Sequence, residues 1–397
     1  MKTGVVSSFF QKYTMILALI VVVIFFAITT DGKILYAQNI NNLISQNAYV
    51  FVLATGMLMC ILTGGNIDLA VGSVVCFAGG VGAVMLKSGL NVWIAVLAML
   101  VIGLLIGYFQ GFWIAWISVP PFIATLAGMY AFRGLSNVVL NGYAVAINDK
   151  VFLNVFGGGA DCYVPDFFKV ESVSLNVTCL IAGAIVALIY LATTISGVIK
   201  EKKLAIASES PAIKLVKAVV ICIIIMVFAY ILASYKGIPS GLVWIAAVML
   251  IYNYILNNTA IGRYLYAVGG NEKATALSGV NTKLVYFIAY ANMGFLAGLA
   301  GILTVARASS AQPTYGQGYE MDAIAACFIG GASAYGGTGK ISGVFIGAAL
   351  LGVINQGMSI MGVDSNYQRV VKGIVLLLAV MFDIMSKREK LGICETH

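Results

Sequence analysis

The segment Asn257–Lys283 reads NNTAIGRYLYAVGGNEKATALSGVNTK and forms a polar island between two long apolar stretches. Its centre has the pattern of a short, capped helix. Asn271 is a good N-cap, and Glu272 would lie next to the positive end of the helix. Residues Ala274–Leu277 favour helix, and Gly279 can end it in a left-handed conformation. We therefore expect a short helix here, presented either as a rigid surface or as a well-formed connector.

Two glycines, Gly269 and Gly270, precede this helix. Glycine adopts backbone conformations that other residues avoid, so we expect the pair to let the chain turn sharply into the helix.

The composition on both sides of this island is that of a membrane protein. Of the 397 residues, 61% are hydrophobic and only 10% are charged, with a mean hydropathy of +0.99. Soluble domains average about 25% charged residues. The net charge of +8 resides in the connectors, so it does not indicate a nucleic-acid partner. We expect one all-α, polytopic transmembrane domain over residues 1–397, embedded in a lipid bilayer.

About twelve stretches are apolar enough for membrane-spanning helices, which need about 20 such residues. They are Tyr13–Thr29, Ala48–Thr63, Leu69–Leu86, Val92–Ile117, Phe122–Leu140, Leu175–Ile195, Ala218–Ala233, Leu242–Leu256, Leu284–Val305, Met321–Ala334, Ile341–Ile360 and Gln368–Ser386.

The lysines and arginines predict the orientation, because cytoplasmic loops are enriched in them. With a cytoplasmic N-terminus, three basic regions fall inside: the loop 197–217, the loop 257–283 and the tail from residue 387. The opposite orientation would place all three outside. Both termini are therefore expected in the cytoplasm.

Three separated blocks resemble one family. GRYLYAVGGNEKATALSGVNT within the polar island, ARASSAQPTYGQGYEMDAIAACFIGGASAYGGTG at Ala306–Gly339 and GGNIDLAVGS at Gly64–Ser73 are similar to signatures of permease subunits of bacterial ABC importers for ribose, xylose, galactose and multiple sugars. The likeness covers most of the chain. Residues Gly197–Gly237 look more like the xylose and multiple-sugar branch than the shorter ribose type.

The resemblance implies a BtuC-like (type II) ABC permease bundle in the bacterial cytoplasmic (inner) membrane. Two copies would form the pathway, and an extracytoplasmic binding protein would deliver a monosaccharide, with xylose favoured over galactose, glucose or several sugars. Separate ATPase subunits, which hold ATP and Mg, would press on the loop 257–283. The ATPase-coupling residues would be Gly269, Gly270, Asn271, Glu272, Lys273, Ala274, Leu277, Ser278 and Gly279.

Catalytic and metal sites are not indicated, and we expect this chain to bind no cofactor. The seven cysteines are scattered without metal-binding spacing, and the one histidine is the terminal His397. The stretch Gly336–Lys340 resembles part of a phosphate-binding loop. However, the full motif needs glycine at 334 and Ser or Thr at 341, where this chain has Ala334 and Ile341. We therefore expect no ATPase in this chain and do not expect an enzyme.

Polar residues inside membrane helices are candidates for function. Gln110, Asn355 and Gln356 are placed to hydrogen-bond a passing sugar. Asn66 and Asp68 are either pathway residues or a cap of the third span, with Asn66 at the N-cap and Asp68 in the first turn.

Opposite charges at a similar predicted depth suggest structural ion pairs. Glu320 and Asp322 open the tenth predicted span, and Arg369 and Lys372 lie near the start of the twelfth. An ion pair would make these charges tolerable in the membrane.

The alternative function is a self-sufficient secondary transporter coupled to protons or sodium through Asp68 or Asp322. Both carboxylates are predicted at the ends of spans, whereas such coupling sites usually lie near the midplane.

Overall fold

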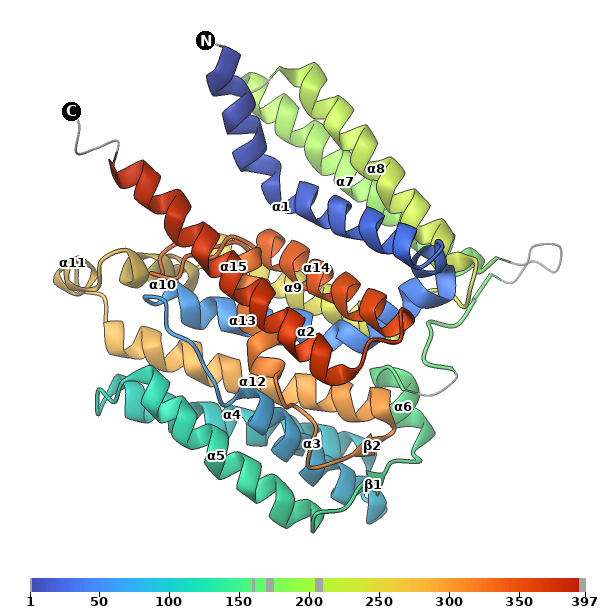
Figure 1. The fold of residues 1–397 in the computed structure, drawn as a ribbon, viewed down its shortest axis with the longest axis vertical. Helices are drawn as coiled ribbons and strands as arrows, with labels where there is room; N and C mark the ends of the chain where they lie inside the picture. Colours follow the sequence, from blue (N-terminus) through green and yellow to red (C-terminus); the bar gives the residue numbers. More distant parts are fainter. Residues whose placement is uncertain (1, 159–160, 169–174, 204–209, 393–397) are drawn as a thin grey trace.

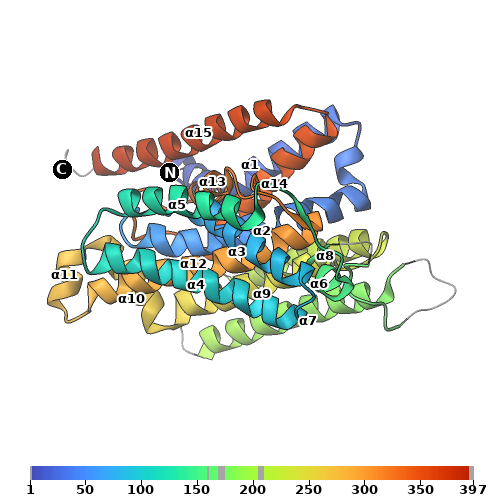
Figure 2. The same cartoon turned by 90° about the horizontal axis from the view of Figure 1, so that it is seen from below.

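Helices laid side by side make up most of the computed structural model, which describes residues 2–158, 161–168, 175–203 and 210–392 (Figures 1 and 2). The order is α1 (Lys2–Thr29), the 3-10 helix η1 (Lys33–Leu35), α2 (Ala37–Leu62), α3 (Val71–Lys87), α4 (Val92–Ala115), α5 (Pro121–Leu140), β1 (Val145–Ala146), α6 (Lys150–Phe156), α7 (Val177–Lys203), α8 (Pro211–Ala233), α9 (Ser240–Asn258), α10 (Ala260–Gly270), α11 (Glu272–Leu277), α12 (Thr282–Ala308), β2 (Ser310–Ala311), α13 (Tyr319–Ile329), α14 (Ile341–Ile360) and α15 (Ser365–Gly392).

Eight of the described helices are long and apolar enough to cross a membrane: α2, α4, α5, α7, α8, α9, α12 and α14. Shorter apolar helical stretches occur at Met15–Thr29 of α1 and in α3. Each of the twelve predicted spans falls at least partly on a helix. Among the described residues, β structure consists of the antiparallel pair β1–β2, which joins Val145 to Ala311 and Ala146 to Ser310, and an isolated bridge between Tyr163 and Pro239.

The tenth predicted span, Met321–Ala334, is wrong as a complete span. The corresponding helix α13 has 11 residues. At 1.5 Å per residue it is about 16 Å long, roughly half the hydrocarbon thickness of a bilayer. Its first residue, Tyr319, stacks on Tyr49 with ring centroids 3.6 Å apart. Since Tyr49 lies halfway along α2, α13 starts inside the bundle rather than at its edge.

The chain that leads into α13 is non-helical, and it is held by α5. Arg133 Nη1 donates to Tyr315 O at 2.6 Å and to Pro313 O at 3.3 Å. Non-helical backbone is tolerated at membrane depth only where protein or water satisfies it. The span prediction failed here because hydropathy does not register such a re-entrant segment.

Helix α12 lies at the centre of the bundle and contacts α4 through glycines on both helices. A Cβ atom at Gly103 would lie 2.4 Å from Gly294 O, and one at Gly107 would lie 2.5 Å from Tyr290 O. Small residues let membrane helices approach this closely. Together with α2, α12 supplies the most buried part of the core.

Helices α7 and α8 pack on each other as a pair at one side of the bundle, and most of their apolar side chains are exposed (Figure 1). They cover most of Gly197–Gly237, the part of the sequence that departs from the ribose type. Residues 204–209 of the predicted basic loop 197–217 lie outside the described residues.

The N-terminal end of α1, the end of α15 and the α10–α11 segment all lie toward one end of the molecule, whereas α6 lies toward the other (Figures 1 and 2). We call these the α11 end and the α6 end. His397 lies outside the described residues.

Candidate functional site

The capped helix of the polar island is present as α11. Asn271 Oδ1 accepts a hydrogen bond from Ala274 N at 3.0 Å, as an N-cap does. Gly279, two residues beyond the helix, has a φ of +88°, the left-handed conformation expected of it. The residues before α11, Ala260–Gly270, form a further helix, α10, which the sequence pattern did not predict.

The role expected of Gly269 and Gly270 is wrong. Both residues end α10, and the chain changes direction at Asn271, whose backbone is extended. Gly269 instead permits a close approach, because a Cβ atom there would lie 1.8 Å from Leu62 O at the end of α2. At Gly270 a Cβ atom would meet nothing within 4 Å.

Helix α11 presents an exposed surface at the α11 end. Leu277 is 90% exposed, and Lys273, Ala274 and Ser278 are also exposed. Glu272 accepts a hydrogen bond from Tyr286 Oη at 3.1 Å, which ties the start of α11 to the first turns of α12.

A cavity of about 340 Å³ lies beside α11. Glu272 and Tyr286 line it together with Asn66 and the residues 118–121 that connect α4 to α5. The structure thus brings one predicted pathway residue, Asn66, next to one predicted coupling residue, Glu272.

Asn66 and Asp68 do not cap the third span, so this expectation is wrong. Helix α3 begins at Val71, after an irregular segment. Asn66 Nδ2 donates instead to Thr63 O at 3.2 Å. Asp68 lies before the helix rather than in its first turn; it is 1% exposed, and its Oδ1 accepts from Ala70 N at 2.8 Å.

The other predicted pathway residues are on two helices, Gln110 on α4 and the adjacent Asn355 and Gln356 on α14. Gln110 is buried on α4, and its Nε2 has no hydrogen-bond partner. On α14, Asn355 Nδ2 donates to Asn47 Oδ1 at 3.2 Å, and the buried Gln356 Oε1 has no partner. None of the three lines the cavity beside α11.

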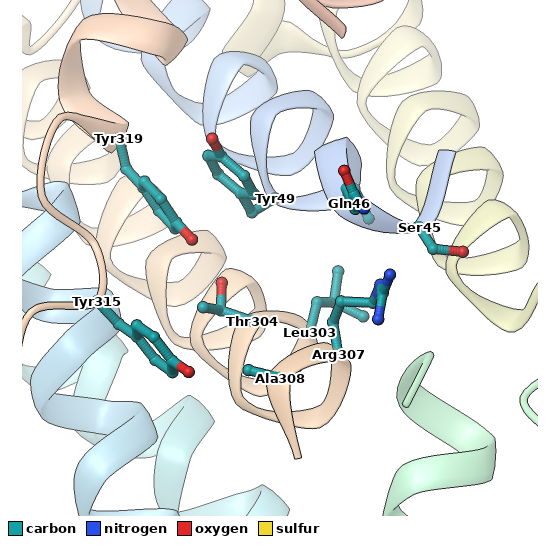
Figure 3. A pocket seen from close by; sticks show the side chains of 10 residues that line it. Ser45, Gln46, Tyr49, Leu303, Thr304, Arg307, Ala308, Tyr315 and Tyr319 are labelled. Carbon is teal, nitrogen blue, oxygen red and sulfur yellow. The ribbon is translucent and has the colours of Figure 1, made fainter. Parts of the chain in front are cut away.

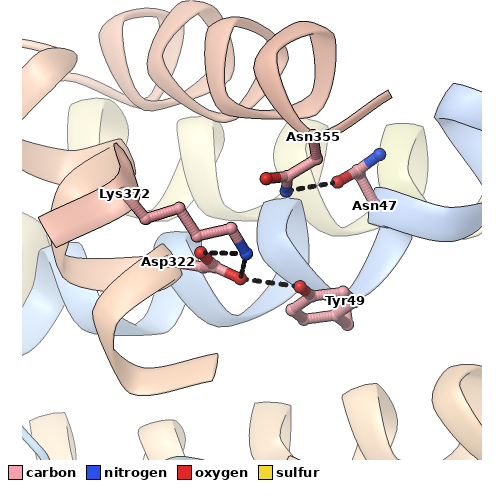
Figure 4. Close-up of polar contacts among 5 residues, drawn as sticks. All are labelled: Asn47, Tyr49, Asp322, Asn355 and Lys372. Carbon is pink, nitrogen blue, oxygen red and sulfur yellow. Dashed lines mark hydrogen bonds and ion pairs between the residues drawn. The ribbon is translucent and has the colours of Figure 1, made fainter. Parts of the chain in front are cut away.

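Of the four residues expected in ion pairs, Asp322 and Lys372 are brought together (Figure 4). Lys372 Nζ lies 2.9 Å from Asp322 Oδ1, and Tyr49 Oη donates to Asp322 Oδ2 at 2.7 Å. Glu320 lies beside Gly72 of α3, and Arg369 is exposed on α15.

A second cavity, of about 240 Å³, lies between α2, α12 and the segment that leads into α13 (Figure 3). Its polar and aromatic lining includes Gln46, Tyr49, Thr304, Arg307, Tyr315 and Tyr319. The sequence analysis singled out none of them. Three of the six, Arg307, Tyr315 and Tyr319, lie in the block Ala306–Gly339. The resemblance of this block to the family was the sequence signal that could have pointed to them.

Comparisons with known proteins identify the family. The family described as branched-chain amino acid transport system / permease component matches residues 39–380, and the chain belongs to it. The xylose transport system permease protein XylH of Escherichia coli (strain K12) is 34% identical over 392 residues, which cover 97% of this chain and 95% of the relative. XylH of Haemophilus influenzae is 34% identical over 385 residues, 96% of this chain and 97% of the relative.

The ribose import permease protein RbsC of Escherichia coli (strain K12) is 35% identical over 347 residues, 87% of this chain and 85% of the relative. No solved structure matches the chain. The resemblance to permease subunits is confirmed, so the chain is a multi-pass membrane protein and is not itself the ATPase.

Proposed function

We propose that this chain forms the membrane pathway of an ATP-driven importer for a monosaccharide, with xylose favoured. The observation that carries the proposal is the similarity to xylose permeases, which extends over 97% of the chain at 34% identity. The alignment with the ribose permease covers less, 87% of the chain. Galactose, glucose or several sugars are the alternative substrates.

In the proposed mechanism, α11 is the contact for a separate ATPase that holds ATP and Mg²⁺. The exposed surface around Leu277 and the hydrogen bond from Tyr286 to Glu272 support this role. Movement of α11 would pass to α12, and from there to α2 and α4, which pack against it. The chain would thus do mechanical work driven by hydrolysis elsewhere.

In the proposed orientation, the α11 end faces the cytoplasm with both termini and the loops 197–217 and 257–283. The basic residues of these loops support it. The α6 end would then receive sugar from an extracytoplasmic binding protein. A second copy of the chain would complete the pathway, as in a BtuC-like (type II) homodimer in the bacterial inner membrane.

The test is sugar uptake into vesicles with this chain in the membrane, its ATPase on the inner side and its binding protein on the outer side. We expect uptake of D-xylose that requires internal ATP and stops when the ATPase is inactivated. D-ribose and D-galactose supplied in parallel would rank the substrates. Absence of ATP-dependent uptake of all three sugars would contradict the proposal.

The same vesicles test the alternative, an ion-coupled transporter that uses Asp68 or Asp322. The expectation that both carboxylates lie at the ends of spans is wrong for Asp322, because it contacts Tyr49 halfway along α2. Its pairing with Lys372 nevertheless favours a structural role. Uptake driven by an imposed proton or sodium gradient without ATP would support the alternative.

A further inference from the structure

We propose that the cavity between α2, α12 and the start of α13 binds one neutral monosaccharide as it passes from the α6 end into the bundle. The site rests on the proposed function and adds to it a specific place where this chain contacts its substrate.

The position of the cavity fits a station on a transport path. Arg307 and Ala308 are the last residues of α12, and Gly158, just after α6, packs against Ala306 O. At the other end the cavity reaches Tyr49, halfway along α2, which forms part of its floor. The cavity therefore extends from the α6 end to about half the depth of the bundle, where a helix begins within the membrane. Transporter substrate sites are typically formed at this depth by discontinuous helices.

Its floor is aromatic. Tyr49 and Tyr319 stack with an interplanar angle of 13°, and Tyr315 lines another part of the same cavity (Figure 3). Sugar rings present apolar C–H faces that pack on aromatic rings, while their hydroxyl groups need hydrogen-bond partners. An aromatic floor next to polar walls matches both requirements.

Two polar groups in the walls have unfilled hydrogen-bonding capacity. Thr304 is 8% exposed, and its buried Oγ1 points toward the hydroxyl of Tyr319, with which it interacts without a hydrogen bond of good geometry (Figure 3). Arg307 Nε is also buried without a partner. Leaving buried polar groups unpaired costs stability, so a ligand that pairs them gains that energy on binding.

The size limits the ligand. A cavity of 240 Å³ is smaller than the roughly 300–1,000 Å³ of pockets for drug-sized molecules, which suits a single sugar ring. Arg307 supplies several donors to hydroxyl oxygens but also one positive charge. A uronic acid, which carries a carboxylate, is therefore the informative competitor.

The experiment uses the purified full-length chain with a reporter cysteine at Ala308, which lines the cavity and is exposed. We expect D-xylose to slow alkylation of Ala308→Cys by iodoacetamide. It should not slow alkylation of Thr314→Cys, a control on the exposed part of the neighbouring loop. Equal alkylation with and without D-xylose, D-ribose and D-galactose would overturn the proposal. Protection by D-glucuronate alone would overturn the assignment of a neutral sugar.

The second variant separates binding from structure. Thr304→Val keeps the shape of the side chain and removes a hydroxyl that has no well-formed partner, so a merely structural residue would tolerate it. We expect it to raise the sugar concentration needed for half-protection roughly fivefold, the loss of one hydrogen bond. An unchanged half-protection concentration would remove Thr304 from the site and contradict the proposal.

Measuring uptake in vesicles distinguishes failure of the sugar-binding site from failure of the proposed importer function. ATP-dependent sugar uptake without protection of Ala308→Cys would leave the importer intact and the binding site refuted. Protection without ATP-dependent uptake would keep the site and refute the importer.

Discussion

Lys372 of α15 lies with its Nζ 2.9 Å from Oδ1 and 3.0 Å from Oδ2 of Asp322 in α13, and Asp322 in turn accepts a hydrogen bond from Tyr49 of α2. Three helices that are far apart in the sequence are joined at one buried carboxylate. Asp322 is only 2% exposed, so its charge depends on these two partners.

Breaking this ion pair should destabilise the bundle. Asp322→Asn leaves the ammonium group of Lys372 without its counter-charge. Because the Lys372 side chain is 23% exposed, we expect a cost of about 1–3 kcal/mol, below the roughly 3–5 kcal/mol of a fully buried pair. We expect a lower thermal midpoint in detergent and less protein in the membrane. The double variant Asp322→Asn with Lys372→Gln should recover part of the loss. If the effects of the two single variants simply add in the double variant, the pair is not energetically coupled.

Gly269 and Gly270 provide a matched pair of substitutions. Gly269→Ala would place a Cβ atom 1.8 Å from Leu62 O and force α10 away from α2. We expect a loss of about 1–3 kcal/mol, as for other overpacked sites. Gly270→Ala meets nothing within 4 Å and should be neutral or slightly stabilising, because alanine favours helix. Equal thermal midpoints for the two variants would contradict the close packing of α10 on α2.

The stiffness of α11 should matter for coupling. Ala274→Pro removes the N–H that the Asn271 cap accepts, at about 0.5–2 kcal/mol, and disfavours the helical conformation of the preceding Lys273. Gly279→Val places a β-branched residue at a φ of +88°. Both positions are exposed, so insertion should be near normal. We expect ATP hydrolysis in the reconstituted complex to lose its stimulation by sugar-loaded binding protein.

Arg263→Ala is the control for that experiment, because Arg263 is exposed on α10, outside the expected coupling residues, and its change leaves α11 intact. It should keep the stimulation. Normal stimulated hydrolysis in well-expressed Ala274→Pro protein would show that α11 is only a connector.

The proposed orientation can be checked by labelling. Lys273 and Lys150 are exposed at the α11 end and the α6 end. A membrane-impermeant maleimide should label Lys150→Cys in intact cells and Lys273→Cys only in inverted vesicles. The wild-type chain measures the background, since five of its cysteines, Cys60, Cys76, Cys162, Cys179 and Cys327, are buried. Labelling of Lys273→Cys from outside would refute both the orientation and the coupling role.

Local patterns in the sequence predicted the local structure well. The cap at Asn271 and the left-handed Gly279 depend on neighbouring residues, so the short helix could be read from a few letters. The apolar stretches likewise identified helices, because the bilayer sets their length and composition.

Features that depend on distant residues were not predictable in the same way. The tight contact of Gly269 with Leu62 joins separate helices, and the irregular segment that delays the start of α3 to Val71 is partly buried against other parts of the bundle. The cavity near Thr304 needed side chains from α2, α12 and the segment before α13 at once. Charge complementarity was the exception, since it suggested the partner of Asp322 without showing the fold.

The non-helical segment held by Arg133 has a consequence for biogenesis. Its carbonyl groups at Pro313 and Tyr315 cannot rest in lipid, and their donor lies in α5. A nascent chain emerges from its N-terminus, so α5 is inserted well before residues 312–318 are synthesised. The earlier helices can therefore act as a template on which the last quarter of the polypeptide assembles.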